Sequence, residues 1–192
     1  MSLVAFKARN HRQQPVRDDV DDRRTPRPFF DRLHARHAFT VDAAASAENA
    51  LLPVYWTRET DALEQRWDDH RVWCNPPYSD LASWTWKARW ELANGCGLVV
   101  MLVPANRCEQ KWWQRDVEPY RDGRYRLYQA ASLRVDFLSG RMRFGWPETK
   151  VFDKRGDRPP FGCALLTWTS TARSDRQPKR DMSAGSETDP NG

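Results

Sequence analysis

The sequence predicts an α/β fold: a mostly parallel sheet with an antiparallel hairpin near its C-terminal end. A short apolar run, Val72-Trp73-Cys74, and a longer one from Gly97 to Pro104 are typical of buried strands. Apolar residues at helical spacing lie between them, so this region predicts one βαβ unit. Apolar residues then alternate with polar ones within 124–146, which is the pattern of antiparallel strands.

Length and charge allow a single domain with polar ends. The chain has 192 residues, and its charged residues make up 30% of the sequence. We expect a flexible basic arm over 1–24, the domain over 25–168, and a disordered polar tail over 169–192. A net charge of +5 permits a nucleic-acid partner.

Hydrophobic runs and cysteines indicate the compartment. The sequence has no apolar run near the ~20 residues of a membrane span, and its N-terminus lacks the apolar core of a secretory signal. Four widely spaced cysteines without a C-x-x-C pair are typical of reduced thiols. We therefore expect a cytoplasmic protein with no membrane partner.

The first helix is predicted to start at Thr25-Pro26, with Thr25 as the N-cap and Pro26 at the first helical position. Phe29, Phe30 and Leu33 give this helix an apolar face. Two histidines lie near its end without a third ligand or a carboxylate partner, so the sequence predicts no metal site there.

A short strand over 39–42 ends in Asp42, and small residues that include Ala44 and Ser46 follow it. An acid just past a strand can bind a ribose hydroxyl or an amino group, and small side chains let a ligand approach the backbone. Ser46 can instead begin a helix cap. Further on, Asp61 and Ala62 could line an adenine pocket or form an exposed acidic turn, and both interpretations stay open.

The central motif is Asn75-Pro76-Pro77-Tyr78, directly after the first apolar run. The prolines end the strand and fix the backbone of the turn. The Asn75 side chain and the Pro76 carbonyl offer two hydrogen-bond acceptors beside the aromatic face of Tyr78. This combination suits an exocyclic amino group on a flat ring, although a plain Pro-Pro turn after a core strand has the same sequence.

A helix is predicted from Ser79 or Asp80 to about Asn94, where Asn94-Gly95 ends it. Trp86 and Trp90 form an i,i+4 pair with basic neighbours, among them Arg89. This face could contact nucleic acid, although core packing explains at least one of the two tryptophans.

The last third of the chain is expected to hold a helix capped by Asn106 and carrying Lys111, and a hairpin turning at Ser139-Gly140. A basic loop over 147–160 and a closing strand over 161–168 follow. The residues of this loop that we expect to contact DNA phosphates are Lys150, Lys154, Arg155 and Arg158.

The central motif at a strand end resembles the catalytic motif of amino-group methyltransferases that use S-adenosylmethionine. With the Thr25-Pro26 helix start, the Asp42 loop, Asp61-Ala62 and the closing strand, the chain resembles the phage-type DNA N6-adenine methyltransferases over about 25–168. The resemblance implies a Rossmann-like, seven-stranded class I methyltransferase fold. It also implies S-adenosylmethionine as cofactor, double-stranded DNA as partner, no metal and a phage or prophage origin in a bacterial cytoplasm.

By the same resemblance, Thr25 and Pro26 lie near the methionine end of the cofactor, and Asp42, Ala44 and Ser46 form its first loop. Asp61 and Ala62 approach its adenine or ribose. Catalysis falls to Asn75, Pro76, Pro77 and Tyr78, with Asn75 also near the cofactor. The predicted DNA contacts outside the loop are Trp86, Arg89, Trp90 and Lys111.

Other functions remain open from sequence alone. An RNA-adenine, cytosine-N4 or protein-glutamine methyltransferase uses the same motif chemistry, and a catalytically silent nucleic-acid binder has the same basic and aromatic surface. The chain has no room for a separate target-recognition domain, so we expect a short or relaxed target sequence and a monomer.

Overall fold

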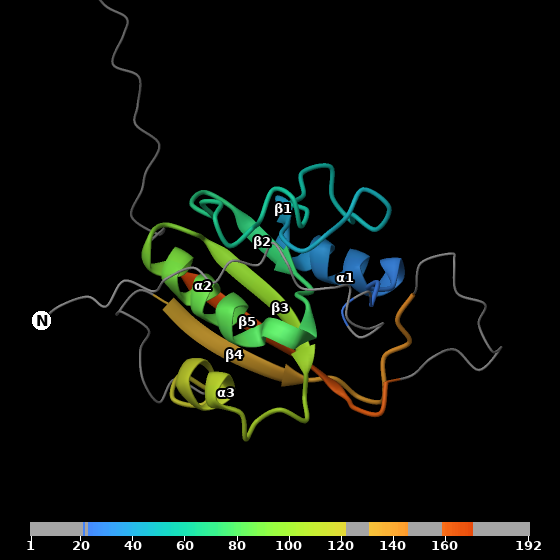
Figure 1. The fold of residues 1–192 in the computed structure, drawn as a ribbon, viewed down its shortest axis with the longest axis vertical. Coiled ribbons are helices and arrows are strands. Elements are labelled where there is room, and N and C mark those ends of the chain that lie inside the picture. The colour runs from blue at the N-terminus through green and yellow to red at the C-terminus, as the bar shows by residue number, and fades with distance from the viewer. Residues whose placement is uncertain (1–20, 22, 122–130, 146–158, 171–192) are drawn as a thin grey trace, which may run out of the picture.

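The computed structural model describes residues 21, 23–121, 131–145 and 159–170. They form one five-stranded sheet in the order β1-β2-β3-β5-β4 (Figure 1). The strands are β1 (Val41–Asp42), β2 (Arg71–Cys74), β3 (Leu98–Pro104), β4 (Ala131–Phe137) and β5 (Cys163–Ser170). The helices are α1 (Arg27–His37), α2 (Leu81–Ala93) and α3 (Lys111–Asp116), with a 3₁₀ turn, η2 (Tyr78–Asp80), before α2.

The strand directions confirm a mostly parallel α/β sheet. β1, β2 and β3 are parallel neighbours, and β5 runs antiparallel between β3 and β4. The described residues give five strands rather than the seven that the resemblance implies. Tyr55 adds only an isolated parallel bridge to Asp42, at the outer edge of β1.

The predicted βαβ unit is confirmed in β2, α2 and β3. The Asp80 side chain accepts a 3.4 Å hydrogen bond from the Ser83 backbone N–H and so caps α2. After α2, Gly95 adopts φ +113°, a conformation that favours glycine. Figure 1 shows α2 lying across the sheet in front of β3 and β5.

Several predicted boundaries are wrong. α1 begins at Arg27 with Pro26 at the cap position and no side-chain cap, so Thr25 does not cap it. α3 begins after Gln110, not after Asn106. The strand predicted around Phe144 is absent among the described residues, because β4 pairs with β5 instead.

Two described segments make contacts at the edges of the 25–168 span in which we expect the domain. At the C-terminal side, β5 continues to Ser170, where it pairs with β4. At the N-terminal side, Arg24 pairs through its backbone with Gly145, at 2.8 Å in both directions. Ordered contacts therefore include residues on both sides of the expected 25–168 span.

A buried ion pair ties α2 to the core. The Lys87 Nζ atom lies 2.6 Å from Oε1 of Glu91, and both side chains are almost fully buried. The other oxygen of Glu91 accepts the backbone N–H of Trp67 at 2.8 Å. Glu91 thus satisfies a backbone donor of the preceding loop as well as the lysine.

Two kinds of feature are absent from the described residues. No helix in this part of the chain is long and apolar enough to cross a membrane. Nor do these residues contain a group of three or more His, Cys, Asp or Glu side chains placed to hold a metal ion.

Candidate active site at the carboxyl ends of β1 and β2

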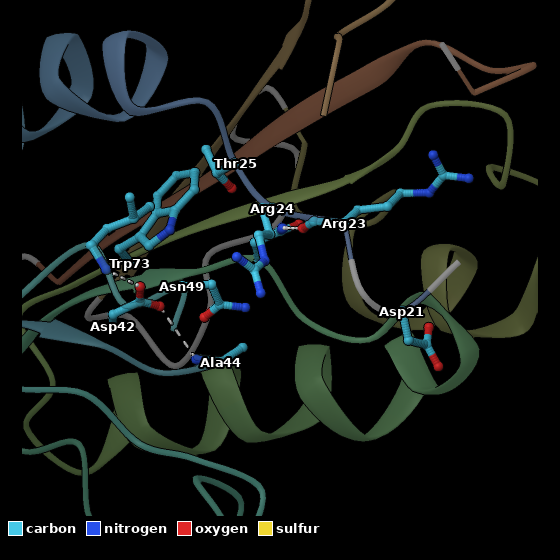
Figure 2. A pocket seen from close by; sticks show the side chains of 10 residues that line it. Asp21, Arg23, Arg24, Thr25, Asp42, Ala44, Asn49 and Trp73 are labelled. Atoms are coloured by element: carbon cyan, nitrogen blue, oxygen red, sulfur yellow. Dashed lines mark hydrogen bonds between the residues drawn. The ribbon is translucent and has the colours of Figure 1, made fainter. Parts of the chain in front are cut away.

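A pocket opens where β1 and β2 end, the edge at which open α/β sheets bind ligands. Asp42 is the last residue of β1, and Asn75 follows the last residue of β2. The lining residues are Asp21, Arg23, Arg24, Thr25, Asp42, Ala44, Asn49, Leu51, Trp73 and Asn75. Figure 2 shows Asp42 and Asn49 together on one side, with the Arg23 side chain directed away from them.

Asp42 is a buried carboxyl group held by backbone donors. Its two oxygens accept the N–H groups of Ala44, at 3.4 Å, and Leu51, at 3.1 Å. Burial raises the pKa of Asp42 to about 6, although these two hydrogen bonds oppose the shift. Each oxygen keeps a further lone pair for a ligand donor.

The amide of Asn75 has a fixed orientation. Its Nδ2 donates a 2.7 Å hydrogen bond to the backbone carbonyl of Arg23. Its Oδ1 is buried and accepts no hydrogen bond from the described residues. An orphaned buried acceptor is costly, so this atom is suited to a ligand N–H.

Tyr78 lies within a cluster of aromatic rings that we call the aromatic cluster, consisting of Tyr78, Phe144 and Phe161. Its ring centre is 6.5 Å from that of Phe144 and 6.0 Å from that of Phe161, both edge-on. Burial raises the pKa of Tyr78 well above its usual value, and the Cys163 thiol next to the hydroxyl acts in the same direction. Tyr78 is therefore a neutral aromatic surface at physiological pH.

A short segment crosses the Asn75-Pro76-Pro77-Tyr78 motif, and we call its residues Asp21, Arg23, Arg24 and Thr25 the strap. The Asp21 carboxylate accepts the backbone N–H of Ser79 at 3.0 Å and its hydroxyl at 2.6 Å. The Arg23 guanidinium carbon lies 5.7 Å from the ring centre of Phe144 and 5.4 Å from that of Phe161. The strap thus contacts the motif at Asn75 and the turn directly after it at Ser79.

Four of the predicted cofactor residues meet at the pocket: Thr25, Asp42, Ala44 and Asn75. The Thr25 hydroxyl is buried and has no partner among the described residues. The other predicted cofactor residues do not line this pocket: Pro26, Ser46, Asp61 and Ala62. Asp61 instead accepts the backbone N–H of Leu63 at 3.0 Å, as in a simple turn.

The predicted DNA-contacting residues divide into three groups. Trp86 and Trp90 stack on each other with ring centres 5.6 Å apart and are 38% and 46% exposed. Lys111 is also exposed. Arg89, however, is mostly buried and pairs with Asp116 and Tyr120. The loop positions lie outside the described residues: Lys150, Lys154, Arg155 and Arg158.

Sequence reasoning missed several pocket residues. Asp21 and Arg23 belong to a stretch whose composition predicts a flexible arm, and only tertiary contacts show their place. Asn49 and Leu51 lie shortly after Asp42 in the sequence, and this closeness along the chain was the signal that could have placed them at the pocket. Phe144 belongs to the 124–146 stretch whose alternation predicts antiparallel strands; it is buried, although it lies outside the described strands.

Comparison with known proteins assigns the chain to a family. The family model described as DNA N-6-adenine-methyltransferase (Dam) matches residues 11–174. A DNA N-6-adenine-methyltransferase of Escherichia phage T1 is 32% identical over 130 residues, covering 60% of this chain and 53% of the relative. The matched part thus spans about half of that relative's length.

Proposed function

Because the chain belongs to the DNA N-6-adenine-methyltransferase family, we propose that it transfers a methyl group from S-adenosylmethionine to N6 of an adenine in double-stranded DNA. The observation that carries this proposal is the Asn75 amide: its nitrogen is engaged by Arg23, and its buried oxygen is left as an acceptor beside Tyr78.

The residues of the pocket fit a cofactor with hydroxyl and ammonium donors. Asp42 offers lone pairs on a buried carboxyl group, and Thr25 has a buried hydroxyl without a partner among the described residues. Ala44 leaves room for close approach to the loop backbone. When bound, S-adenosylmethionine supplies a methyl group on a positively charged sulfur.

On the substrate side, the target base must leave the duplex, at a cost of a few kcal/mol. Stacking on Tyr78 offsets part of that cost, by ~1–3 kcal/mol. Asn75 Oδ1 and the Pro76 carbonyl then accept the two N–H bonds of the adenine amino group. These hydrogen bonds draw the amino nitrogen toward tetrahedral geometry, and its lone pair then becomes available to attack the methyl group.

The transfer needs no covalent intermediate on the protein. In the transfer, a bond would form between N6 and the methyl carbon as the carbon–sulfur bond breaks, and the amino group would lose one proton to water. Asn75, Pro76 and Tyr78 contribute positioning and oriented dipoles. Pro77 keeps the turn rigid between them.

We also propose the wider arrangement that the resemblance implies. The reversed β5 and the Tyr55 bridge beside β1 support a seven-stranded class I sheet. One methyltransferase domain, reaching from the strap to the end of β5, would act in a bacterial cytoplasm. DNA would contact it through Trp86, Trp90, Lys111 and the basic loop.

The test is transfer of labelled methyl from S-adenosylmethionine to unmethylated DNA, followed by mass spectrometry of the nucleosides. We expect N6-methyladenine. Label found in N4-methylcytosine, in RNA or in protein glutamine would show that the substrate differs from the proposed one. If no label is transferred and calorimetry detects no binding of S-adenosylhomocysteine, the protein is a nucleic-acid binder without catalytic activity.

A further inference from the structure

Arg23 is a buried cation inside the aromatic cluster. Arg23 is only 9% exposed, and its guanidinium lies over the rings of both Phe144 and Phe161. Burial raises the pKa of Tyr78 well above its usual value, and the nearby Arg23 charge acts in the opposite direction. An arginine from a polar segment thus lies over two of the three rings of the aromatic cluster.

A guanidinium and a nucleobase share the relevant chemistry. Both are flat, both stack on aromatic rings, and both carry N–H donors in their plane. Arg23 also touches the motif directly, since its carbonyl accepts the Asn75 amide at 2.7 Å. The same residue thus contacts the motif through its backbone and two phenylalanine rings through its side chain, next to the place where the proposed function requires a flat, amino-bearing ring.

We propose that the aromatic cluster is the pocket for the target base and that the Arg23 side chain fills it in the DNA-free protein. This proposal rests on the proposed function of the same site. A base enters only when the strap moves and carries the guanidinium out from between the rings. Phe144 and Phe161 then join Tyr78 in contacting the base.

The contacts of the strap indicate how it opens. Arg24 is held by two backbone hydrogen bonds to Gly145, whereas Asp21 is held through its side chain to Ser79. The Asp21 contacts are exposed to water, which can replace them at little cost. Opening thus requires release of Asp21 from Ser79 while the Arg24 end acts as the hinge.

The first experiment locks the strap. In the full chain carrying both Asp21→Cys and Ser79→Cys, a disulfide replaces the hydrogen bonds between these neighbouring residues. We expect the oxidised protein to lose methyl transfer to DNA by about tenfold or more and to recover it with reductant. Binding of S-adenosylhomocysteine should be the same in the oxidised and the reduced form of this variant, because the cross-link changes only the freedom of the strap to move.

The single variants, Asp21→Cys and Ser79→Cys, receive the same oxidant and control for the exposed Cys108. Peptide mass mapping establishes the cross-link. A cross-linked protein that transfers methyl groups as fast as its reduced form would overturn the proposal. If the cross-link does not form, the second experiment decides.

The second experiment empties the pocket and needs no catalysis. With the cofactor site saturated by S-adenosylhomocysteine, Arg23→Ala should bind adenosine about tenfold more tightly than the unchanged protein in calorimetry, because the competing side chain is gone. Arg32→Ala is the matched control, since Arg32 lies 5.9 Å over Phe29 on α1, outside the pocket.

Circular dichroism and melting show whether Arg23→Ala is folded, and Arg23→Gln serves in its place if it is not. Adenosine binding that is unchanged or weaker in a folded variant would overturn the proposal. Tighter adenosine binding in a protein that methylates nothing would uphold the pocket and refute the proposed function, so the two failures are distinguishable.

Discussion

The side-chain nitrogen of Asn75 donates to the carbonyl oxygen of Arg23 at 2.7 Å. A carbonyl can only accept, so this contact decides which end of the amide turns toward the pocket. The 3₁₀ turn that follows places the Tyr78 ring nearby. The carbonyl oxygen of Arg23 thereby orients the Asn75 amide so that its oxygen, the proposed catalytic acceptor, faces the pocket.

Asn75→Ala should reduce methyl transfer by about 10²-fold or more while S-adenosylhomocysteine still binds, since an oriented dipole at the reacting atom is lost. Single-turnover transfer and calorimetry measure the two effects. Asn94→Ala is the matched control, because Asn94 also donates Nδ2 to a backbone carbonyl at 2.7 Å, but at the exposed end of α2. Near-normal turnover of Asn75→Ala would refute the assigned role.

Asn75→Asp should also lower transfer, but in a pH-dependent way. An ionised carboxylate has no proton to donate to the Arg23 carbonyl, so oxygen faces oxygen. A protonated carboxyl group can donate, and the ratio of variant to unchanged rate should therefore rise as the pH falls from 8 to 5. A ratio that stays flat or falls over this range would show that the Arg23 contact does not set the amide orientation.

Asp42 should make cofactor binding pH-dependent. Its pKa in the ligand-free protein is about 6, and ligand hydroxyl or ammonium donors favour the ionised form. Affinity for S-adenosylhomocysteine should be full above pH 7 and fall by up to about tenfold per pH unit below 6. Calorimetry at several pH values measures it. In Asp42→Asn, which does not titrate, this dependence should disappear, and its persistence there would contradict the assignment.

The same pKa shift has a consequence for stability. The folded-state pKa lies above the unfolded value of 3.8, so the folded chain binds more protons between about pH 4 and 6. The Asp42 contribution to the free energy of unfolding therefore decreases as the pH rises through this window. Urea unfolding of the unchanged protein and of Asp42→Asn at pH 5 and 7 isolates the contribution.

Lys87→Ala should lower the free energy of unfolding by ~3–5 kcal/mol, because it leaves the Glu91 carboxylate buried without its counter-ion. Urea denaturation measures the loss. Arg27→Ala is the control: its ion pair with Asp31 is also an i,i+4 contact, at 2.7 Å, but is exposed. That variant should change stability by less than ~1 kcal/mol. Equal effects of the two substitutions would mean that burial of the Lys87 pair is unimportant.

Removing both Trp86 and Trp90 should weaken DNA binding. If each ring stacks on a base, the loss is ~1–3 kcal/mol per base. Binding of labelled duplex and single-stranded DNA measures it at fixed salt. Phe137→Ala is the control, since Phe137 is 57% exposed on β4. Unchanged affinity in the double variant would exclude this face of α2 from the DNA contact.

Local patterns predicted the central unit well. Apolar runs fixed β2 and β3, and Asp80 and Gly95 marked the ends of α2, because burial and capping act over a few residues. Asn75 and Asp42 were placed at one pocket for a similar reason: both follow parallel strands, whose carboxyl ends meet at one edge of the sheet.

Other features of the structure depend on a partner that is distant along the chain. Arg89 appeared basic and available, but Asp116, 27 residues later, captures it. Thr25 is a residue type that often caps helices, yet it does not cap α1, and its hydroxyl is buried at the pocket. Arg23 appeared to belong to a flexible arm until the rings of Phe144 and Phe161 were seen to enclose it. No local pattern contains these contacts.

The place of β5 has a consequence for how the chain is made. Its residues pair with β3 on one side and β4 on the other, so an interior strand of the sheet is the last of the described strands to be synthesised. At 5–20 residues per second, β3 waits roughly 3–12 s after its own synthesis for this neighbour. During that interval the nascent protein presents an unpaired apolar edge. Chaperone demand and aggregation should therefore peak in chains stalled before Cys163.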